Sequence, residues 1–126
     1  MLHDSWSSFS VRDLEAARTF YSQVLGIRVK ILEMGILELH PPGGLKLWLY
    51  PKRDHQPATF TVLNFLVDDI DKEVERLNGL GIRFDTYEGF QADEKGIVRS
   101  ENGPPIAWFR DPSDNIIALI QAAPTA

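Results

Sequence analysis

The sequence predicts an α+β fold made of two tandem βαβββ modules related by a pseudo-twofold axis. Their curved sheets are expected to surround a central cavity, with the helices on the outer face. The first observation behind this prediction is an internal repeat, because residues 9–29 match residues 65–84 at seven positions in the same order. The second is that each copy begins with the same strand and capped helix. One module cannot cover both faces of its own sheet, so two are needed.

The first copy starts with a strand and a helix that meet at Asp13. The residues before Asp13 alternate and are rich in β-formers, as in a half-buried strand. Asp13 suits an N-cap, and Glu15 lies in the first turn, where the helix dipole favours an acid. Gly26 is placed to end the helix in the left-handed conformation. Between these ends runs one apolar stripe at helical spacing, formed by Leu14, Ala17, Tyr21, Val24 and Leu25.

Three short strands are expected after this helix, separated by turns rich in glycine and proline. They cover roughly 27–33, 36–40 and 45–50. The second copy repeats the pattern with Asp69 as the cap, and its later strands are expected near 82–87, 104–110 and 115–121. The polar, glycine-spaced segment 88–103 is interpreted as a mobile flap.

The length and composition bound the organisation and the partners. The 126 residues suit one domain, with module 1 over about 1–52, a connection over 53–59 and module 2 over about 60–122. The absence of cysteine excludes thiolate metal sites. A net charge of −5 without a cluster of basic residues argues against a nucleic-acid partner. No apolar run approaches the roughly 20 residues that span a bilayer, and the first residues do not resemble a signal segment. We therefore expect no membrane partner and a cytoplasmic location.

Three segments together span most of the chain and carry a family resemblance. They read FSVRDLEAARTFYSQVLGI (9–27), FLVDDIDKEVERLNGLGI (65–82) and DPSDNIIALI (111–120). In these segments the chain resembles the vicinal oxygen chelate superfamily, the group of glyoxalase I, extradiol dioxygenases, and fosfomycin and bleomycin resistance proteins. The resemblance implies paired βαβββ modules and a homodimer. It does not imply one function.

The resemblance also implies where a metal ion would bind. Most enzymes of that superfamily hold a divalent metal with His, Gln or Glu from four strands. The first of these positions lies seven residues before the capping Asp, which is Trp6 in the first copy and Val62 in the second. The position in the last strand is Ala118, and repeat symmetry puts the fourth on Trp48, or one residue away on Leu47. None of these side chains can coordinate a hard or borderline metal. We therefore expect no metal site and no cofactor.

Strand alternation identifies the side chains expected to line the cavity. Phe9 and Val11 should pack under the first helix, so the alternate positions face inward. The alternation does not decide whether Trp108 or its neighbours Ala107 and Phe109 face inward. A pocket lined in this way suits a planar organic ligand held between aromatic rings. The predicted lining consists of Trp6, Ser8, Ser10, Lys46, Trp48, Tyr50, Val62, Asn64, Leu66, Trp108 and Ala118.

The histidines are the remaining candidates for chemistry. Glu38 and His40 share one face near the end of a strand and could form an acid–base pair, with Tyr50 as a third candidate catalytic residue. The alternative for this pair is a solvated strand rim. His3 and His55 are expected on the surface, outside any site.

Three functions compete on these observations. The leading hypothesis is a metal-free protein that binds a planar or hydrophobic small molecule, as a bleomycin-resistance-like sequestering protein or a sensor would. The alternative is a glyoxalase-like enzyme of the lyase, isomerase or dioxygenase type, with a displaced metal or a metal-independent Glu/His/Tyr site. The third is a structural or regulatory module in which Trp6 and Trp48 only fill the core. The sequence does not identify the ligand.

Overall fold

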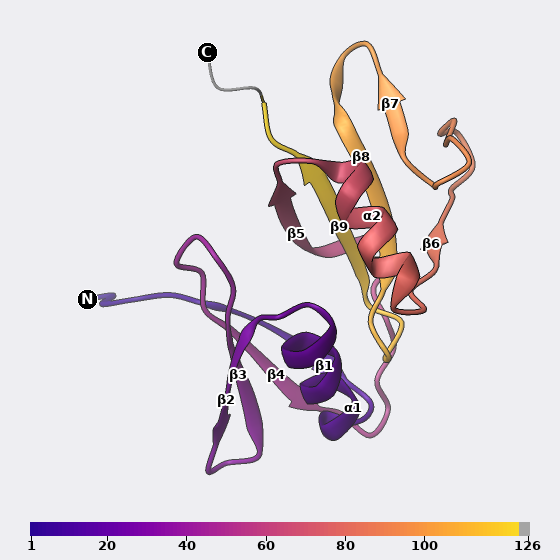
Figure 1. Ribbon diagram of the computed structural model, residues 1–126. Coiled ribbons are helices and arrows are strands. Elements are labelled where there is room, and N and C mark those ends of the chain that lie inside the picture. The colour runs from indigo at the N-terminus through magenta and orange to yellow at the C-terminus, as the bar shows by residue number, and fades with distance from the viewer. Residues whose placement is uncertain (124–126) are drawn as a thin grey trace. The chain divides into compact units, whose positions relative to one another are not determined.

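Figure 1 shows the structure, a computed structural model that describes residues 1–123 of the chain. The chain divides into two compact units, each described in turn. The first comprises Met1–Pro57 together with Asp111–Asp114, and the second comprises Ala58–Arg110 and the chain from Asn115 onward. None of the helices within residues 1–123 has both the length and the apolar character needed to cross a membrane.

The first unit holds a four-stranded sheet in the order β1-β4-β3-β2. β1 (Ser7–Val11) pairs in parallel with β4 (Leu47–Pro51), and β3 (Ile36–His40) runs antiparallel to both β4 and β2 (Arg28–Leu32). The strand expected at 45–50 begins later, because the turn before it includes two glycines, 43 and 44, with positive φ.

The helix of the first unit has the predicted start and end but not a uniform interior. Asp13 is its N-cap, and the Asp13 carboxylate accepts a backbone N–H of the first turn at 3.1 Å. α1 (Leu14–Thr19) then widens into a π-helical segment, η1 (Phe20–Val24). Gly26 follows with φ +69° and ends the helix. The apolar spacing alone does not distinguish a π-helical turn from an α-helical one.

The helix covers one face of this sheet and leaves the other free. Leu37 and Leu39 of β3 are buried, whereas the residues that alternate with them are only half-buried. Together with Leu37 and Leu39, the core beneath the helix consists of Val11, Ala17, Tyr21, Leu47 and Leu49. The opposite face, called the first helix-free face below, carries Ser8, Ser10, Glu38, His40, Trp48 and Tyr50.

A buried hydrogen-bond network holds the turn Asp111–Asp114 within the first unit. The Tyr21 hydroxyl donates to Oδ2 of Asp111 at 2.7 Å, and Oδ1 of Asp111 accepts the Ser113 N–H at 2.8 Å. Tyr21, Asp111 and Ser113 are all buried. Each of these hydrogen bonds satisfies a polar group that has no access to water.

His55 joins the same network, and its expected place on the surface is wrong. The ring is buried, with Nε2 at 2.9 Å from the Ser113 carbonyl oxygen and Nδ1 at 2.5 Å from the Ser10 hydroxyl. Because a carbonyl only accepts, Nε2 carries the hydrogen, and Ser10 donates to Nδ1 when the ring is neutral. The residues around His55 are polar, so nothing local in the sequence indicates that the ring is buried.

The second unit repeats the arrangement of the first. Its sheet has the order β5-β9-β8-β6, with β7 added beside β8. β5 pairs in parallel with β9, as β1 does with β4, and β8 is antiparallel to β9. α2 (Ile70–Gly79) begins at its cap Asp69, and Gly81 follows it with positive φ. The strands are β5 (Thr61–Val67), β6 (Phe84–Asp85), β7 (Val98–Ser100), β8 (Gly103–Arg110) and β9 (Ile116–Gln121). The βαβββ order of both units, with β7 as an additional strand in the second, confirms the predicted fold class.

The interpretation of 88–103 as one mobile flap is wrong for its second half. That half contains β7, and Ile97 and Val98 are buried. Lys95 donates to carboxylate oxygens of Asp71 and Glu75 on α2, at 3.2 and 2.8 Å. The buried apolar pair and these ion pairs attach the segment to the second unit, although its composition is that of a loop.

Candidate functional site

Two tryptophan rings lie in contact on the first helix-free face. Trp6 precedes β1, and its ring centroid is 4.9 Å from that of Trp48 in β4, with 44° between the ring planes. Nζ of Lys46 lies 3.9 Å from the centre of the Trp6 ring, a cation–π contact. Trp6 is 41% exposed. The pair therefore presents exposed aromatic surface of the kind that stacks on planar rings.

Glu38 fixes the second of these rings. Its two carboxylate oxygens accept the indole N–H of Trp48 at 2.9 Å and Nε2 of His40 at 2.8 Å. The Trp48 hydrogen bond holds the pKa of the Glu38 carboxyl below its usual value; burial opposes this effect and the His40 hydrogen bond reinforces it. A carboxylate stabilised as an anion in this way is a weak general base at neutral pH. Glu38 is therefore better suited to positioning Trp48 and His40 than to moving a proton.

The remaining predicted residues of the first unit lie on the same face. Across β1 and β4, Ser8 is opposite Trp48 and Ser10 is opposite Tyr50. Tyr50 is 38% exposed, whereas the Ser10 hydroxyl is engaged with His55. The structure thus brings together Trp6, Ser8, Ser10, Lys46, Trp48 and Tyr50.

In the second unit the strand pairing decides which way Trp108 faces. Trp108 is opposite Ala118 across β8 and β9, and Ala118 is opposite Asn64 across β9 and β5. These residues share a face, called the second helix-free face below. Ala107 and Phe109 are fully buried on the other face of the sheet. The alternation of residues did not decide which way Trp108 faces, and the strand pairing places it on the second helix-free face.

The second helix-free face differs from the first in what it exposes. Leu66 of β5 is 72% exposed and Asn64 is exposed, while Val62 is half-buried beside an irregularity in the β5–β9 pairing. Ala118 is completely buried and presents no surface to a ligand. Of the five predicted residues in this unit, Ala118 is thus the one that the structure leaves inaccessible.

Two aromatic residues that the sequence analysis missed pack against Trp108. The ring of Tyr87 meets it edge-on at 5.4 Å between centroids, and the ring of Phe90 lies at 5.3 Å. Burial raises the pKa of the Tyr87 hydroxyl, and Asp85 adds to the rise. Phe90 is 54% exposed. Both residues come from the segment between β6 and β7, which has no periodicity, so their aromatic character was the only available signal.

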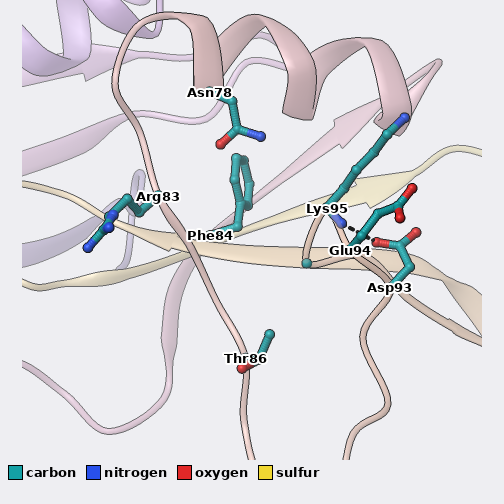
Figure 2. Close-up of a pocket in the computed structure, with 8 residues that line it drawn as sticks. Asn78, Arg83, Phe84, Thr86, Asp93, Glu94 and Lys95 are labelled. Carbon is teal, nitrogen blue, oxygen red and sulfur yellow. Dashed lines mark hydrogen bonds between the residues drawn. The ribbon is translucent and has the colours of Figure 1, made fainter.

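A separate depression lies at the end of α2 (Figure 2). Its volume is about 280 Å³, slightly below the usual range of small-molecule sites. A turn closes one side, where the Lys95 N–H donates to Asp93 Oδ1 at 2.9 Å. Its lining is mostly polar and contains no tryptophan. It is formed by Asn78, Arg83, Phe84, Thr86, Asp93, Glu94, Lys95 and Gly96. Because the lining of this depression is mostly polar, we place the candidate site on the helix-free faces.

Comparison with known families agrees with these paired units. The profile of the Glyoxalase/Bleomycin resistance protein/Dioxygenase superfamily matches residues 6–119. The chain belongs to this superfamily. Among curated proteins, none matches the sequence.

Several solved structures of the superfamily are similar to the chain. TnmS3, an antibiotic binding protein from Streptomyces sp. CB03234, is 26% identical with a TM-score of 0.69, over 98% of this chain and 99% of that one. A glyoxalase/bleomycin resistance protein from the same organism is 27% identical with a TM-score of 0.63, over 93% and 100%. The fosfomycin resistance protein FosX from Listeria monocytogenes has a TM-score of 0.74 at 15% identity, over 98% and 95%, and supports the fold alone.

The superfamily's metal positions can be tested on the donor groups present here. Ser8 of the first unit corresponds to Asn64 of the second in the repeat. Ser8 is paired with Trp48 and Asn64 is paired with Ala118. The counterpart of Ala118 is therefore Trp48 and not Leu47. An indole and a methyl group supply no ligand for a divalent metal. On the same face, Glu38 already accepts hydrogen bonds with both oxygens. Within residues 1–123 no three His, Asp or Glu side chains are grouped to hold a metal ion. The residues present do not fit the superfamily's metal.

Replacing Glu38 by glutamine is expected to destabilise the protein at neutral pH and to have little effect in acid. The folded-state pKa of Glu38 lies below its ordinary value of 4.5. The stabilisation is therefore fully present above pH 4.5 and is lost as the pH falls through the lowered pKa. Urea unfolding of wild type and E38Q at pH 7 and pH 3 measures this difference. Glu33→Gln, in an exposed turn, is the control, and a pH-independent gap for E38Q would contradict the assignment.

Proposed function

We propose that this protein binds a planar, largely apolar small molecule by aromatic stacking, without a metal ion. The observation that carries the proposal is the pair of exposed Trp6 and half-buried Trp48 on the first helix-free face, with ring centroids 4.9 Å apart. Glu38 accepts the Trp48 N–H, so the ring is already oriented before a ligand arrives. Ordering a side chain on binding costs affinity, and a ring held in advance avoids that cost.

The similarity to an antibiotic binding protein supports the same function. TnmS3 carries that description and aligns with this chain over nearly the whole length of both. A protein that sequesters or senses a compound needs affinity but no metal-activated chemistry. The apolar side chains at the superfamily's four metal positions, Trp6, Trp48, Val62 and Ala118, agree with such a function. Assembly as a homodimer, which the family resemblance implies, is part of this proposal.

Metal analysis and tryptophan fluorescence test the proposal together. We expect less than stoichiometric divalent metal in the purified protein, and saturable quenching by at least one compound from a panel of polycyclic aromatic antibiotics. Trp6 and Trp48 lie side by side, so a stacked ring should quench both. One equivalent of metal per chain would refute the metal-free proposal. The absence of saturable binding across the panel would refute ligand binding by stacking.

A second candidate function is general-base catalysis at His40. Glu38 accepts the hydrogen on Nε2 of His40, which leaves Nδ1 as the proton acceptor of the neutral ring. A carboxylate that orients an imidazole is a recurrent arrangement in enzymes. Tyr50 lies on the same face and could donate a proton.

Deuterium exchange measures whether this histidine acts as a base. The probe is 2-acetylnaphthalene, a planar ketone whose methyl protons exchange in deuterated water under base catalysis. If His40 is catalytic, wild-type protein should accelerate the exchange at least about tenfold over His40→Gln. As a control, 2-naphthamide must bind both proteins alike. Equal exchange rates would remove the enzymatic candidate and leave the binding proposal in place.

A further inference from the structure

We propose that the bound molecule carries an anionic group beside its planar ring, and that Lys46 receives this group together with Arg28 and Lys30. The inference rests on the proposed function of the first helix-free face. It names the chemical class of the ligand, which is an aromatic carboxylate or a comparable organic acid.

Basic side chains share the face that carries the tryptophan pair. In the antiparallel pairing of β2 with β3, Arg28 is opposite His40 and Lys30 is opposite Glu38. Residues directly opposite one another project from the same face of a sheet, so both basic residues lie on the first helix-free face. Lys46 reaches that face beside the Trp6 ring. Three basic side chains thus share this face with one acidic strand residue, in a chain of net charge −5.

The charges of these three residues are not neutralised by ion pairs. Among residues 1–123, seven of the basic side chains form ion pairs, but Arg28, Lys30 and Lys46 do not. Glu38 is the acidic strand residue on this face, and its two oxygens accept hydrogen bonds from Trp48 and His40. The face therefore keeps a local positive charge that an anion can satisfy.

The position of Lys46 connects this charge to the aromatic surface. Its ammonium lies over the Trp6 ring, 3.9 Å from the ring centre, and the Trp48 ring is 4.9 Å from Trp6 between centroids. The inference places the ligand ring against the tryptophan pair and its anionic substituent at this ammonium. Hydrogen bonds between ionised partners are stronger than neutral ones, so a carboxylate is favoured over an uncharged group of the same shape. The chain's overall negative charge would favour a cation, but the local charges at the rings favour an anion.

Two probes of equal shape test the inference on the intact protein. We measure 2-naphthoate and 2-naphthamide by isothermal titration calorimetry at low ionic strength, where charge interactions are least screened. Wild type is expected to bind the carboxylate about tenfold more tightly than the amide. Lys46→Gln should reduce this preference, the ratio of the two affinities in the same variant, to about twofold or less. Lys72→Gln removes the same charge from an exposed position on α2 and should leave the preference unchanged.

Each result separates the inference from the proposed function. Equal affinity of wild type for both probes overturns the inference and leaves stacking intact. Equal loss of preference in K46Q and K72Q overturns it as well, because the effect would then come from net charge. Failure of both probes to bind overturns the proposed function and the inference with it.

Discussion

Replacing Trp48 by alanine is expected to lower the affinity for 2-naphthamide by about 30-fold, the effect typical of an aromatic residue at the centre of a binding surface. The substitution removes one of the two rings in the 4.9 Å pair and leaves Trp6 without its neighbour. It also removes the Trp48 hydrogen bond to Glu38, whereas the hydrogen bond between Glu38 and His40 remains. Calorimetry is the appropriate measurement, because the substitution removes a fluorophore.

Trp48→Phe separates the ring from its hydrogen bond. Phenylalanine keeps an aromatic surface but cannot donate to Glu38, so we expect an affinity loss of only about threefold from poorer positioning. The pKa of Glu38 should rise, because the Trp48 hydrogen bond is the main cause of its lowering. Phe60→Ala removes an exposed aromatic residue elsewhere and should change nothing. Wild-type affinity in W48A, with circular dichroism unchanged, would refute the stacking site.

The sequence predicted the fold and the residues of the first unit that share the helix-free face, because both depend on local periodicity. Asp13 and Asp69 cap the helices as expected, since capping involves only the first turn. Alternation along β1 and β4 placed Ser8 and Trp48 on one face, and their direct pairing agrees. The repeat supported this, because an offset of 56 transfers the assignments of the first strand and the helix cap from one unit to the other.

The parts that the sequence did not predict depend on contacts between distant residues. His55 forms hydrogen bonds with Ser10, which is 45 positions earlier in the sequence, and with Ser113, which is 58 positions later. The packing of Tyr87 and Phe90 on Trp108 depends on the path of a segment with no periodicity. Neither contact leaves a pattern in the residues around it. Polar surroundings made His55 look exposed, although two hydrogen bonds satisfy its ring inside the unit.

The register also shows how the two copies have diverged in chemistry. Glu38 is opposite Trp48 in the first unit, and the equivalent opposite pair in the second is Trp108 with Ala118. The first unit therefore presents an acid that orients an indole, whereas the second presents an indole over a methyl group. The repeat preserved the strands and their pairing, and the divergence lies in the side chains of the helix-free faces. The internal repeat thus predicts which strand positions in the two units are equivalent, but it does not predict which side chains occupy them.

Asp111→Ala is expected to lower the free energy of unfolding by about 2–5 kcal/mol, although the residue lies in a turn. The carboxylate is buried and accepts the Tyr21 hydroxyl at 2.7 Å and the Ser113 N–H at 2.8 Å. Its removal leaves both donors buried and unpaired, and each costs about 1–3 kcal/mol. Urea denaturation at pH 7 measures the loss.

Asp114→Asn supplies the control from the same turn. Asp114 pairs with Arg12 at 3.0 Å, but both side chains are about half-exposed, so the charge should contribute less than about 1 kcal/mol. Asparagine also tolerates the residue's φ of +65°, so the substitution adds no backbone strain. Tyr21→Phe removes one of the two donors and should cost less than D111A. If D111A and D114N cost the same, burial of the carboxylate does not explain its role. The chain on both sides of the turn Asp111–Asp114 belongs to the second unit, whereas the turn itself belongs to the first. A loss of stability several times larger in D111A than in D114N would show that the buried hydrogen-bond network holds the turn in the first unit.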